Sequence, residues 1–179
     1  MNIDDIIEMK NQLSMFDYML DIAKEPLTEK IIKEFHRILK INTSDEKKDW
    51  FNVGEYKKLV NTVGGKDTTN PEDVAEEMKE LLQKYNTKKD VKIEDIIQFH
   101  FEFERIHPFQ DGNGRVGRMI MFKECLKHSI TPFIIQNDIK QYYYRGLSEF
   151  EKEKGYLTDT CLSAQDRYRE MVEKFLGDR

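Results

Sequence analysis

Twelve consecutive residues, from His107 to Arg118, hold most of the side chains in this sequence that could do chemistry. An imidazole with a pKa near neutrality can take a proton from an incoming hydroxyl, and His107 supplies one. A carboxylate beside a polyphosphate is the usual protein ligand of Mg²⁺, and Asp111 supplies one. Arg115 and Arg118 lie three residues apart, on one face of a helix, where both can reach charged oxygens. Together these groups suit phosphoryl or nucleotidyl transfer.

The backbone of the same segment predicts a cradle for an anion. Gly112 and Gly114 allow tight turns that expose consecutive N–H groups. Asn113 suits the cap of a helix that begins here, and the N-terminus of that helix adds unpaired N–H donors. Pro108 ends the preceding helix and restricts His107 to an extended conformation. We therefore expect a phosphate-binding loop between two helices.

Two simpler interpretations of this segment compete with the first. Residues 112–117 also match G-x-G-x-x-G, a dinucleotide-binding pattern, but that pattern requires a strand before it. The residues before it, 95–106, follow a helical period, and no alternation of strands and helices occurs elsewhere. The other interpretation is an ordinary Asn-Gly turn whose arginines pair with surface acids. Because histidine, aspartate, two glycines and two arginines occur together, we favour the phosphate site.

The elements that must position this loop are predicted to be helices. Residues 93–106 and 116–126 are apolar on most sides, which predicts a central, buried pair of helices on either side of the loop. An N-terminal helix is expected over residues 3–23 and a C-terminal helix over 158–176. The N-terminal helix carries an apolar stripe of Ile6, Met9, Leu13, Phe16 and Leu20. We expect this stripe to lie in the core; the alternative is a docking face for an inhibitory partner.

Only one segment favours a strand. Residues 58–63 are followed by Gly64-Gly65, which is a two-residue hairpin signal. The prediction for the whole chain is an all-α helical bundle with a small β-hairpin, forming a single domain over residues 1–179.

Composition limits the class of protein. The 179 residues include 29 basic and 34 acidic side chains, a net charge of −5, which argues against a general binder of nucleic acid or of anionic membranes. No apolar run approaches the ~20 residues that a membrane helix requires. No secretory signal is visible, and two cysteines cannot form a disulfide framework. We expect a soluble, cytoplasmic protein whose positive charge gathers locally, at Arg105, Arg115 and Arg118.

The remaining histidines are not expected to bind a metal. His100 lies on the buried helix and is interpreted as a hydrogen-bonded core residue. His36 and His128 lack acidic or cysteine partners at metal-ligand spacing, and we interpret them as structural or exposed.

The segment from His107 to Arg118 resembles the signature of the Fic family, H-x-F-x-[D/E]-G-N-G-R-x-x-R, at every specified position. A less specific similarity extends over about residues 27–145. Residues 54–57 resemble the G-x-Y-R segment that enters the family's flap, with Lys57 in place of the usual arginine. Residues 141–147 resemble its Y-Y-x-A-L helix, with Gly146 in place of the usual alanine. The resemblance implies a Fic-type helical bundle with a β-hairpin flap.

The resemblance also implies a protein adenylyltransferase, which transfers AMP from ATP to a tyrosine, threonine or serine hydroxyl of a target protein. It implies that His107 is the general base, that Asp111 holds Mg²⁺ and that Phe109 anchors the loop in the core. The implied phosphate-binding residues are Gly112, Asn113, Gly114, Arg115 and Arg118.

Two further regions receive roles from the resemblance. The flap, about residues 59–68, would hold a target segment as an added strand. Its docking residues would be Leu59, Val60, Asn61, Thr62 and Val63. Tyr143 or Tyr144 would line the adenine pocket; the alternative for both tyrosines is ordinary packing.

Many proteins of this family carry an inhibitory helix with [S/T]-x-x-x-E-[G/N], whose glutamate pairs with the second arginine. In this sequence only Thr68 has a glutamate four residues later, and Asp73 does not fit the last position. The possibilities are an uninhibited protein, a separate antitoxin-like inhibitory partner, or a segment that this chain lacks. Alternative functions are removal of AMP, phosphoryl or other nucleotidyl transfer, and non-catalytic binding of a nucleotide or partner.

Overall fold

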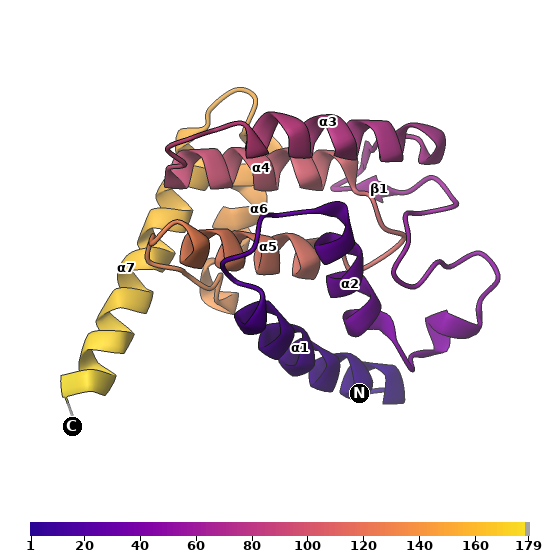
Figure 1. The fold of residues 1–179 in the computed structure, drawn as a ribbon, viewed down its shortest axis with the longest axis horizontal. Helices are drawn as coiled ribbons and strands as arrows, with labels where there is room; N and C mark the ends of the chain where they lie inside the picture. The colour runs from indigo at the N-terminus through magenta and orange to yellow at the C-terminus, as the bar shows by residue number, and fades with distance from the viewer. Residues whose placement is uncertain (178–179) are drawn as a thin grey trace.

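A computed structural model describes residues 1–177, which form seven α-helices and one short hairpin (Figure 1). The helices are α1 (Ile3–Asp21), α2 (Glu29–Lys40), α3 (Val74–Asn86), α4 (Ile93–Ile106), α5 (Asn113–Lys127), α6 (Lys140–Glu149) and α7 (Gly155–Gly177). The strands are β1 (Thr62–Val63) and β2 (Lys66–Asp67), and 3-10 turns cover Ser44–Lys47, Pro71–Asp73 and Asn137–Ile139. The prediction of a helical bundle with a small hairpin is confirmed.

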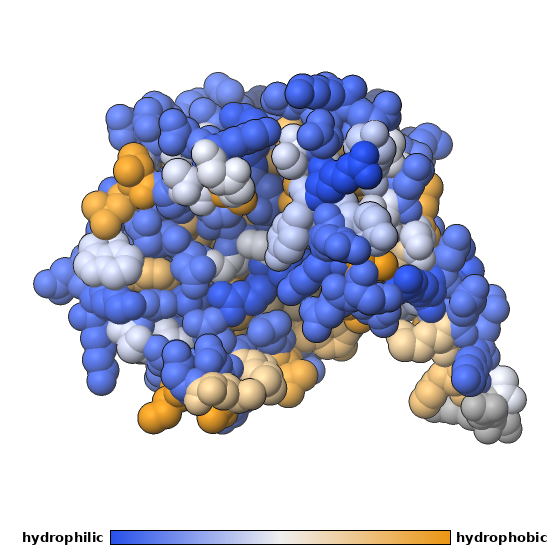
Figure 2. All heavy atoms as spheres, turned by 180° about the vertical axis from the view of Figure 1, so that it is seen from behind, coloured by the Kyte–Doolittle hydropathy of each residue, from blue (hydrophilic) through white to orange (hydrophobic). Residues whose placement is uncertain are grey.

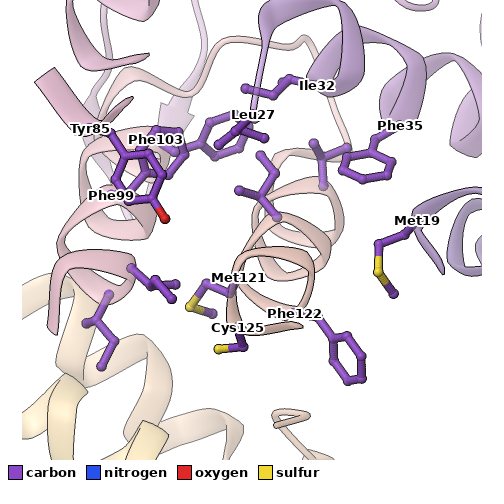
Figure 3. Close-up of a cluster of buried hydrophobic side chains, with 14 of the residues drawn as sticks. Met19, Leu27, Ile32, Phe35, Tyr85, Phe99, Phe103, Met121, Phe122 and Cys125 are labelled. Atoms are coloured by element: carbon purple, nitrogen blue, oxygen red, sulfur yellow. The ribbon is translucent and has the colours of Figure 1, made fainter. Parts of the chain in front are cut away.

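Helix α5 is the centre of the bundle, where it contacts α1, α2 and α4. Figure 1 shows α4 and α5 one above the other, with their connecting loop at the end nearest to α2 and β1. The core side chains come from all of these helices, as in the cluster of Phe35, Phe103 and Met121 (Figure 3). Each fully buried aliphatic or aromatic side chain stabilises the fold by about 1.5–3 kcal/mol. The predicted central pair of helices is therefore present, and it places the loop at one end of a rigid core.

Helix α2 brings two polar side chains to that end of the core. Its N-terminus is capped by Thr28, whose hydroxyl accepts a hydrogen bond from the Ile31 amide at 3.3 Å. Its apolar face, with Phe35 and Leu39, is completely buried. His36 and Lys40 follow these residues on the same face, and both are buried beside the loop.

The hairpin is shorter than predicted. Of the predicted strand over residues 58–63, only Thr62 and Val63 pair, with Asp67 and Lys66 respectively. Gly64 and Gly65 have φ of 55° and 75°, as the predicted two-residue turn requires. Residues 58–61 are not a strand, because side chains of the loop take up their hydrogen-bonding groups.

Helix α1 buries a different face from the predicted one. Four of the five residues in the predicted stripe, Ile6, Met9, Leu13 and Leu20, are 49–69% exposed, so their assignment to the core is wrong. The fifth, Phe16, is partly buried and packs against the core. The buried residues are Asn11, Met15 and Met19. The Asn11 side-chain amide donates to the backbone oxygens of Leu39 and Ile41, both at 2.9 Å, and these bonds orient the helix.

Figure 2 shows hydrophobic residues along the lower left edge, where α1 lies in this view, and near the end of α7 on the lower right. The exposed apolar residues of α7 are Met171, Val172, Phe175 and Leu176. Among residues 1–177, none of the helices is long and apolar enough to cross a membrane.

Candidate functional site

His107 ends helix α4 in a left-handed conformation. Its φ is 52° and its ψ is 61°, and its amide donates to the Phe103 oxygen at 2.9 Å. The extended conformation predicted from Pro108 is therefore wrong, because the chain leaves the helix through a left-handed terminal residue, a position that usually favours glycine. A non-glycine residue held in this region is uncommon and is often found at functional sites.

The His107 side chain is mostly buried, and its surroundings leave one ring nitrogen free. Nδ1 lies 3.3 Å from the backbone oxygen of Glu104. Because a carbonyl oxygen can only accept, Nδ1 carries the proton, and Nε2 keeps its lone pair. Burial lowers the pKa of His107 below its usual value, despite the hydrogen bond to Glu104. The imidazole is therefore neutral at pH 7 and able to accept a proton at Nε2.

Asn113 holds the loop closed instead of capping α5. Its amide nitrogen donates to the Phe109 oxygen at 2.7 Å, and its oxygen accepts from the Phe109 amide at 2.8 Å. The residue at the N-cap is Gly112, with φ of 88°, so the predicted cap at Asn113 is wrong. Phe109 itself is buried, as expected, and stacks on His36 with ring centres 4.1 Å apart.

The start of α5 offers backbone donors. The first helical bond runs from the Val116 amide to the Gly112 oxygen, at 3.1 Å. The amides of Asn113, Gly114 and Arg115 precede this bond and so have no partner within the helix. Unpaired amides at the positive end of a helix dipole are the kind of donors that the predicted cradle for an anion requires.

One side of the loop is a network of ion pairs, which we call the ionic side: Glu8, Lys40, Asp45, Asp111 and Arg115. The buried Lys40 ammonium lies 2.7 Å from Glu8, 2.7 Å from Asp45 and 2.8 Å from Asp111 Oδ2. Arg115 pairs with Glu8 and, at 3.4 Å, with Asp111. Burial opposes the charged ammonium, but hydrogen bonds to the three carboxylates outweigh it and raise the pKa of Lys40.

The ionic side also shows how a metal could bind. Carboxylate oxygens of Glu8, Asp45 and Asp111 lie within 4.8 Å of one another, but the Lys40 ammonium already lies among them. The side chain of Asp111 is 58% exposed, and its contacts with Lys40 and Arg115 are made through Oδ2. Burial alone would raise the pKa of Asp111, but Lys40, Arg115 and a hydrogen bond from the Gly112 amide lower it. Asp111 is thus ionised, and an exposed carboxylate of this kind fits a Mg²⁺ ligand.

Arg118 lies in different surroundings from Arg115. Within residues 1–177 it forms no ion pair with a carboxylate, and its guanidinium carbon lies 5.6 Å from the centre of the Tyr143 ring. Both arginines line one pocket of about 210 Å³ between α1 and α5, which agrees with their predicted common face. The Arg118 guanidinium also hydrogen-bonds the Tyr143 hydroxyl, and no carboxylate ion pair within residues 1–177 competes with an anion that enters this pocket.

The other side of the loop, which we call the dry side, consists of His100, Glu104, His107, Arg118 and Tyr143. His100 is completely buried, and its Nε2 lies 2.5 Å from the Tyr143 hydroxyl, so its interpretation as a hydrogen-bonded core residue is confirmed. Burial lowers the pKa of His100 to about 3. The dry side therefore holds polar groups with little water around them.

The two tyrosines predicted to bind the base lie in different places. Tyr143 is fully buried, and its hydroxyl lies beside His100. Tyr144 is 54% exposed and lines a pocket of about 310 Å³ between the hairpin and helices α4 and α6. Val63, Glu104 and Arg105 line the same pocket. Arg105 does not face the loop, because it pairs with Glu77 and Glu102.

The segment before the hairpin is bonded to the loop. The Lys57 ammonium donates to Asn61 at 2.7 Å and to Thr68 at 2.8 Å, and burial lowers its pKa to about 8. Asn61 also donates to the Phe109 oxygen at 2.9 Å. The Gln110 side chain bonds both the amide and the oxygen of Leu59, at 3.1 and 3.3 Å.

These contacts divide the predicted docking residues into two groups. Asn61 and the backbone of Leu59 already bond to the loop. Val60 and Thr62 are exposed, and Val63 is half-buried.

Four residues of the site were missed by sequence reasoning: Glu8, Lys40, Asp45 and Glu104. Lys40 and Asp111 are 71 positions apart, so no local spacing could connect them. Glu104 could have been found from the sequence, since a residue three positions before His107 lies on the same face of α4.

Comparison with known proteins agrees with this geometry. The model of a family described as the Fic/DOC family matches residues 26–125. The protein adenylyltransferase Fic of Drosophila grimshawi is 28% identical over 129 residues, which are 70% of this chain and 26% of that protein. The corresponding protein of Aedes aegypti is 30% identical over 94 residues, 51% of this chain and 19% of that protein. The chain thus spans about a quarter or less of the length of these relatives.

Solved structures show the same fold. A Fic-domain-containing signaling protein from Bacteroides thetaiotaomicron has a TM-score of 0.78 at 23% identity, over 93% of this chain and 70% of that one. Fic-1 from Caenorhabditis elegans has a TM-score of 0.77 at 18% identity, over 100% of this chain and 54% of that one. BepC from Bartonella tribocorum, solved with bound AMPPNP, has a TM-score of 0.64 at 16% identity, over 89% of this chain and 86% of that one.

Proposed function

The chain belongs to the Fic/DOC family, and from this premise we propose that it transfers AMP from ATP to a tyrosine, threonine or serine hydroxyl of a target protein. The observation that carries the proposal is the hydrogen bond from Nδ1 of His107 to the Glu104 oxygen, which leaves Nε2 to accept a proton, beside the unpaired donors at the start of α5 within residues 1–177. A base and an anion cradle on one loop are what nucleotidyl transfer needs.

In the proposed step, the hydroxyl oxygen of the target forms a bond to the α-phosphorus of ATP. The bond from that phosphorus to the bridging oxygen of the β-phosphate breaks, and pyrophosphate leaves. The hydroxyl proton passes to Nε2 of His107. General base catalysis of this kind contributes about 10²–10⁴-fold to the rate.

The phosphate chain would lie along the amides of Gly112, Asn113 and Gly114 and between the two arginines. Arg118, which forms no carboxylate ion pair within residues 1–177, would hold the γ-phosphate, and Arg115 the phosphates of the departing pyrophosphate. A phosphate at Arg115 competes with Glu8, which pairs with that guanidinium. Asp111 would hold Mg²⁺, and the ion would neutralise part of the phosphate charge.

The pocket between the hairpin and α6 suits the base of the nucleotide. Tyr144 and Val63 line it and offer an aromatic face and an apolar contact. Tyr143 would act indirectly, because its ring packs beside Arg118. A target segment would lie along the exposed residues of the flap, Val60 and Thr62 among them, as an added strand.

The test uses two labels. The protein is incubated with cell lysate, Mg²⁺ and ATP labelled either at the α-phosphate or at the γ-phosphate. We expect protein-bound label from the α-phosphate alone, and none with His107→Ala. His128→Ala is the matched control, because this histidine lies at the far end of α5. Label from the γ-phosphate alone would mean phosphoryl transfer and would contradict the proposal.

A further inference from the structure

Glu104 is a buried carboxyl group whose side chain approaches the base. The residue is 7% exposed, on the last turn of α4, and its Oε2 lies 3.8 Å from Nδ1 of His107. Its other oxygen, Oε1, is inaccessible to solvent and has no hydrogen-bond partner. A buried carboxyl oxygen without a partner costs free energy, so its presence beside a catalytic base requires an explanation.

The surrounding chain is packed to hold Glu104 in this place. A Cβ atom at Gly117 would lie 3.1 Å from Oε1 and 2.9 Å from the His100 ring, so only glycine fits at this position of α5 without a shift. His100 is itself held by the Tyr143 hydroxyl. The carboxyl group cannot easily turn away from His107, because α5 closes the space on its other side.

His107 becomes charged only during the proposed reaction. Its Nδ1 proton is donated to the Glu104 backbone, and its Nε2 accepts the proton of the hydroxyl. The product of that transfer is an imidazolium ion, which is costly in a mostly buried place unless a negative charge lies close. Among the ion pairs within residues 1–177, the carboxylate oxygen that lies within 4.0 Å of a ring nitrogen of His107 is Oε2 of Glu104.

We propose that Glu104 is a positioning residue for proton transfer, whose carboxylate stabilises the imidazolium of His107 formed when Nε2 takes the hydroxyl proton. The inference rests on the proposed function for its chemical step. No further group is consumed: the proton moves from the target oxygen to Nε2, and Glu104 remains a carboxylate. The orientation and charge of His107 would then depend on the side chain of Glu104, which exchanges no proton with either substrate.

The titration of Glu104 supports this role. Burial raises its pKa to about 7, and the charge of Arg118 opposes that rise. The carboxylate is thus present above neutral pH, where the imidazole is neutral and able to act as a base. Charged and titratable groups of several elements surround Glu104 and His107. On the helices they are His100 and Arg105 of α4, Arg118 of α5, and Tyr143 and Tyr144 of α6. Outside these helices they are Lys57, Lys66 and Asp67 around the hairpin, Asp111 on the loop and Glu151 across the pocket.

The first experiment measures the pKa of His107 by NMR of the imidazole signals in the full chain without nucleotide. The chain has four histidines, and His107→Asn identifies the signal. In Glu104→Gln we expect the pKa of His107 to fall by less than one unit, because Glu104, with a pKa of about 7, is charged in only part of the range in which His107 titrates. Glu124→Gln is the matched control: Glu124 is also a buried glutamate with an unpartnered oxygen, but it pairs with Lys123. This control should leave the pKa of His107 unchanged.

The second experiment measures the rate of AMP transfer against pH. Above pH 7, where Glu104 is ionised, an opposite charge at this distance is worth about one pKa unit, so Glu104→Gln should lower kcat about tenfold. In the wild type we expect kcat to rise near pH 7, where Glu104 loses its proton, and this rise should be absent in Glu104→Gln. Glu104→Asp keeps the charge at a greater distance, so its kcat and the pKa of His107 should lie between those of the wild type and Glu104→Gln.

An unchanged pKa of His107 in both Glu104→Gln and Glu104→Asp would overturn the inference. Failure of the wild type to transfer AMP would contradict the proposed function instead, since the NMR titration requires no activity.

Discussion

Arg115 and Arg118 lie one helical turn apart at the start of α5, yet their surroundings are opposite. Arg115 pairs with two carboxylates on the ionic side, where the Lys40 ammonium holds three. Arg118 faces the dry side, where Glu104 has an unpaired oxygen and His100 an unpaired nitrogen. The first side satisfies its charges and fastens the loop to α1 and α2. The second leaves groups unsatisfied, and this is where the proposed proton transfer occurs.

The two sides of the loop should respond differently to mutation, because paired and unpaired buried groups contribute differently to stability. Fully paired buried charges are expensive to break, because removal of one partner leaves the others unpaired. Unpaired buried groups lower stability and are tolerated where they serve a function. The ionic side should therefore respond to mutation mainly in stability, and the dry side mainly in activity and pH dependence.

The largest effect is expected on the ionic side. Lys40→Met should lower the free energy of unfolding by about 3–5 kcal/mol at pH 7.5, because it leaves Glu8, Asp45 and Asp111 together without their ammonium. Urea unfolding measures this value.

The pH dependence of this loss gives a second check. The pKa values of Asp45 and Asp111 are lowered in the folded state, so Lys40 stabilises the fold above the ordinary pKa of these groups, and this contribution disappears as the pH falls. The loss in Lys40→Met should persist down to about pH 4 and shrink below it. Lys33→Met is the control, since Lys33 pairs with the exposed Glu55, and its loss should stay below about 1 kcal/mol. Equal losses in the two variants would contradict the described network.

The next effect concerns Glu104 and stability. Its pKa of about 7 lies above the ordinary 4.5, so between these values the folded protein keeps a proton that the unfolded chain has lost. The contribution of Glu104 to the free energy of unfolding therefore falls as the pH rises from about 4.5 to 7, by about 3 kcal/mol in all. Urea unfolding at a series of pH values measures this effect. Between pH 4.5 and 7, the free energy of unfolding of the wild type should fall by this amount relative to that of Glu104→Gln. A constant difference between the two proteins would mean that the carboxyl group titrates normally.

The two arginines give a direct comparison of intermediate size. Arg118→Ala should weaken ATP binding about tenfold to a hundredfold, because the variant loses a hydrogen bond between charged groups. Its stability should change little. Arg115→Ala should also lower thermal stability, because Glu8 loses its partner. Calorimetric titration with ATP and Mg²⁺, together with thermal unfolding, measures both. A larger loss of stability in Arg118→Ala than in Arg115→Ala would reverse the described difference.

The smallest effect is expected far from both sides. Leu13 is 69% exposed on α1, so Leu13→Ser should change the free energy of unfolding by less than about 0.5 kcal/mol. Met15→Ser, on the buried face of the same helix, is the comparison and should cost several times more. A large loss of stability in Leu13→Ser would mean that the apolar stripe of α1 lies in the core, as the sequence predicts.

The helices and the loop were predictable because their signals are local. Helical periodicity located α4 and α5, and one continuous motif located His107, Asp111 and the arginines. The buried face of α1 was not predictable in this way. Its apolar stripe is regular, but the polar Asn11 orients the helix through bonds to residues almost 30 positions away.

Two departures from the family pattern also have physical reasons that the sequence alone could not provide. Lys57, in place of arginine, reaches Asn61, Thr68 and the Ile106 oxygen with one ammonium, which joins the flap to the loop. Gly146, in place of alanine, lies where a Cβ atom would come within 2.6 Å of the Leu157 backbone. Both depend on contacts between elements that are distant in the chain.

The most direct test of the proposed activity is mass spectrometry of acceptor proteins after incubation of the chain with cell lysate, ATP and Mg²⁺. The account predicts an added AMP group on a tyrosine, threonine or serine side chain, present with the wild-type protein and with His128→Ala and absent with His107→Ala. An added phosphate in place of AMP, or AMP adducts that persist in His107→Ala, would contradict it.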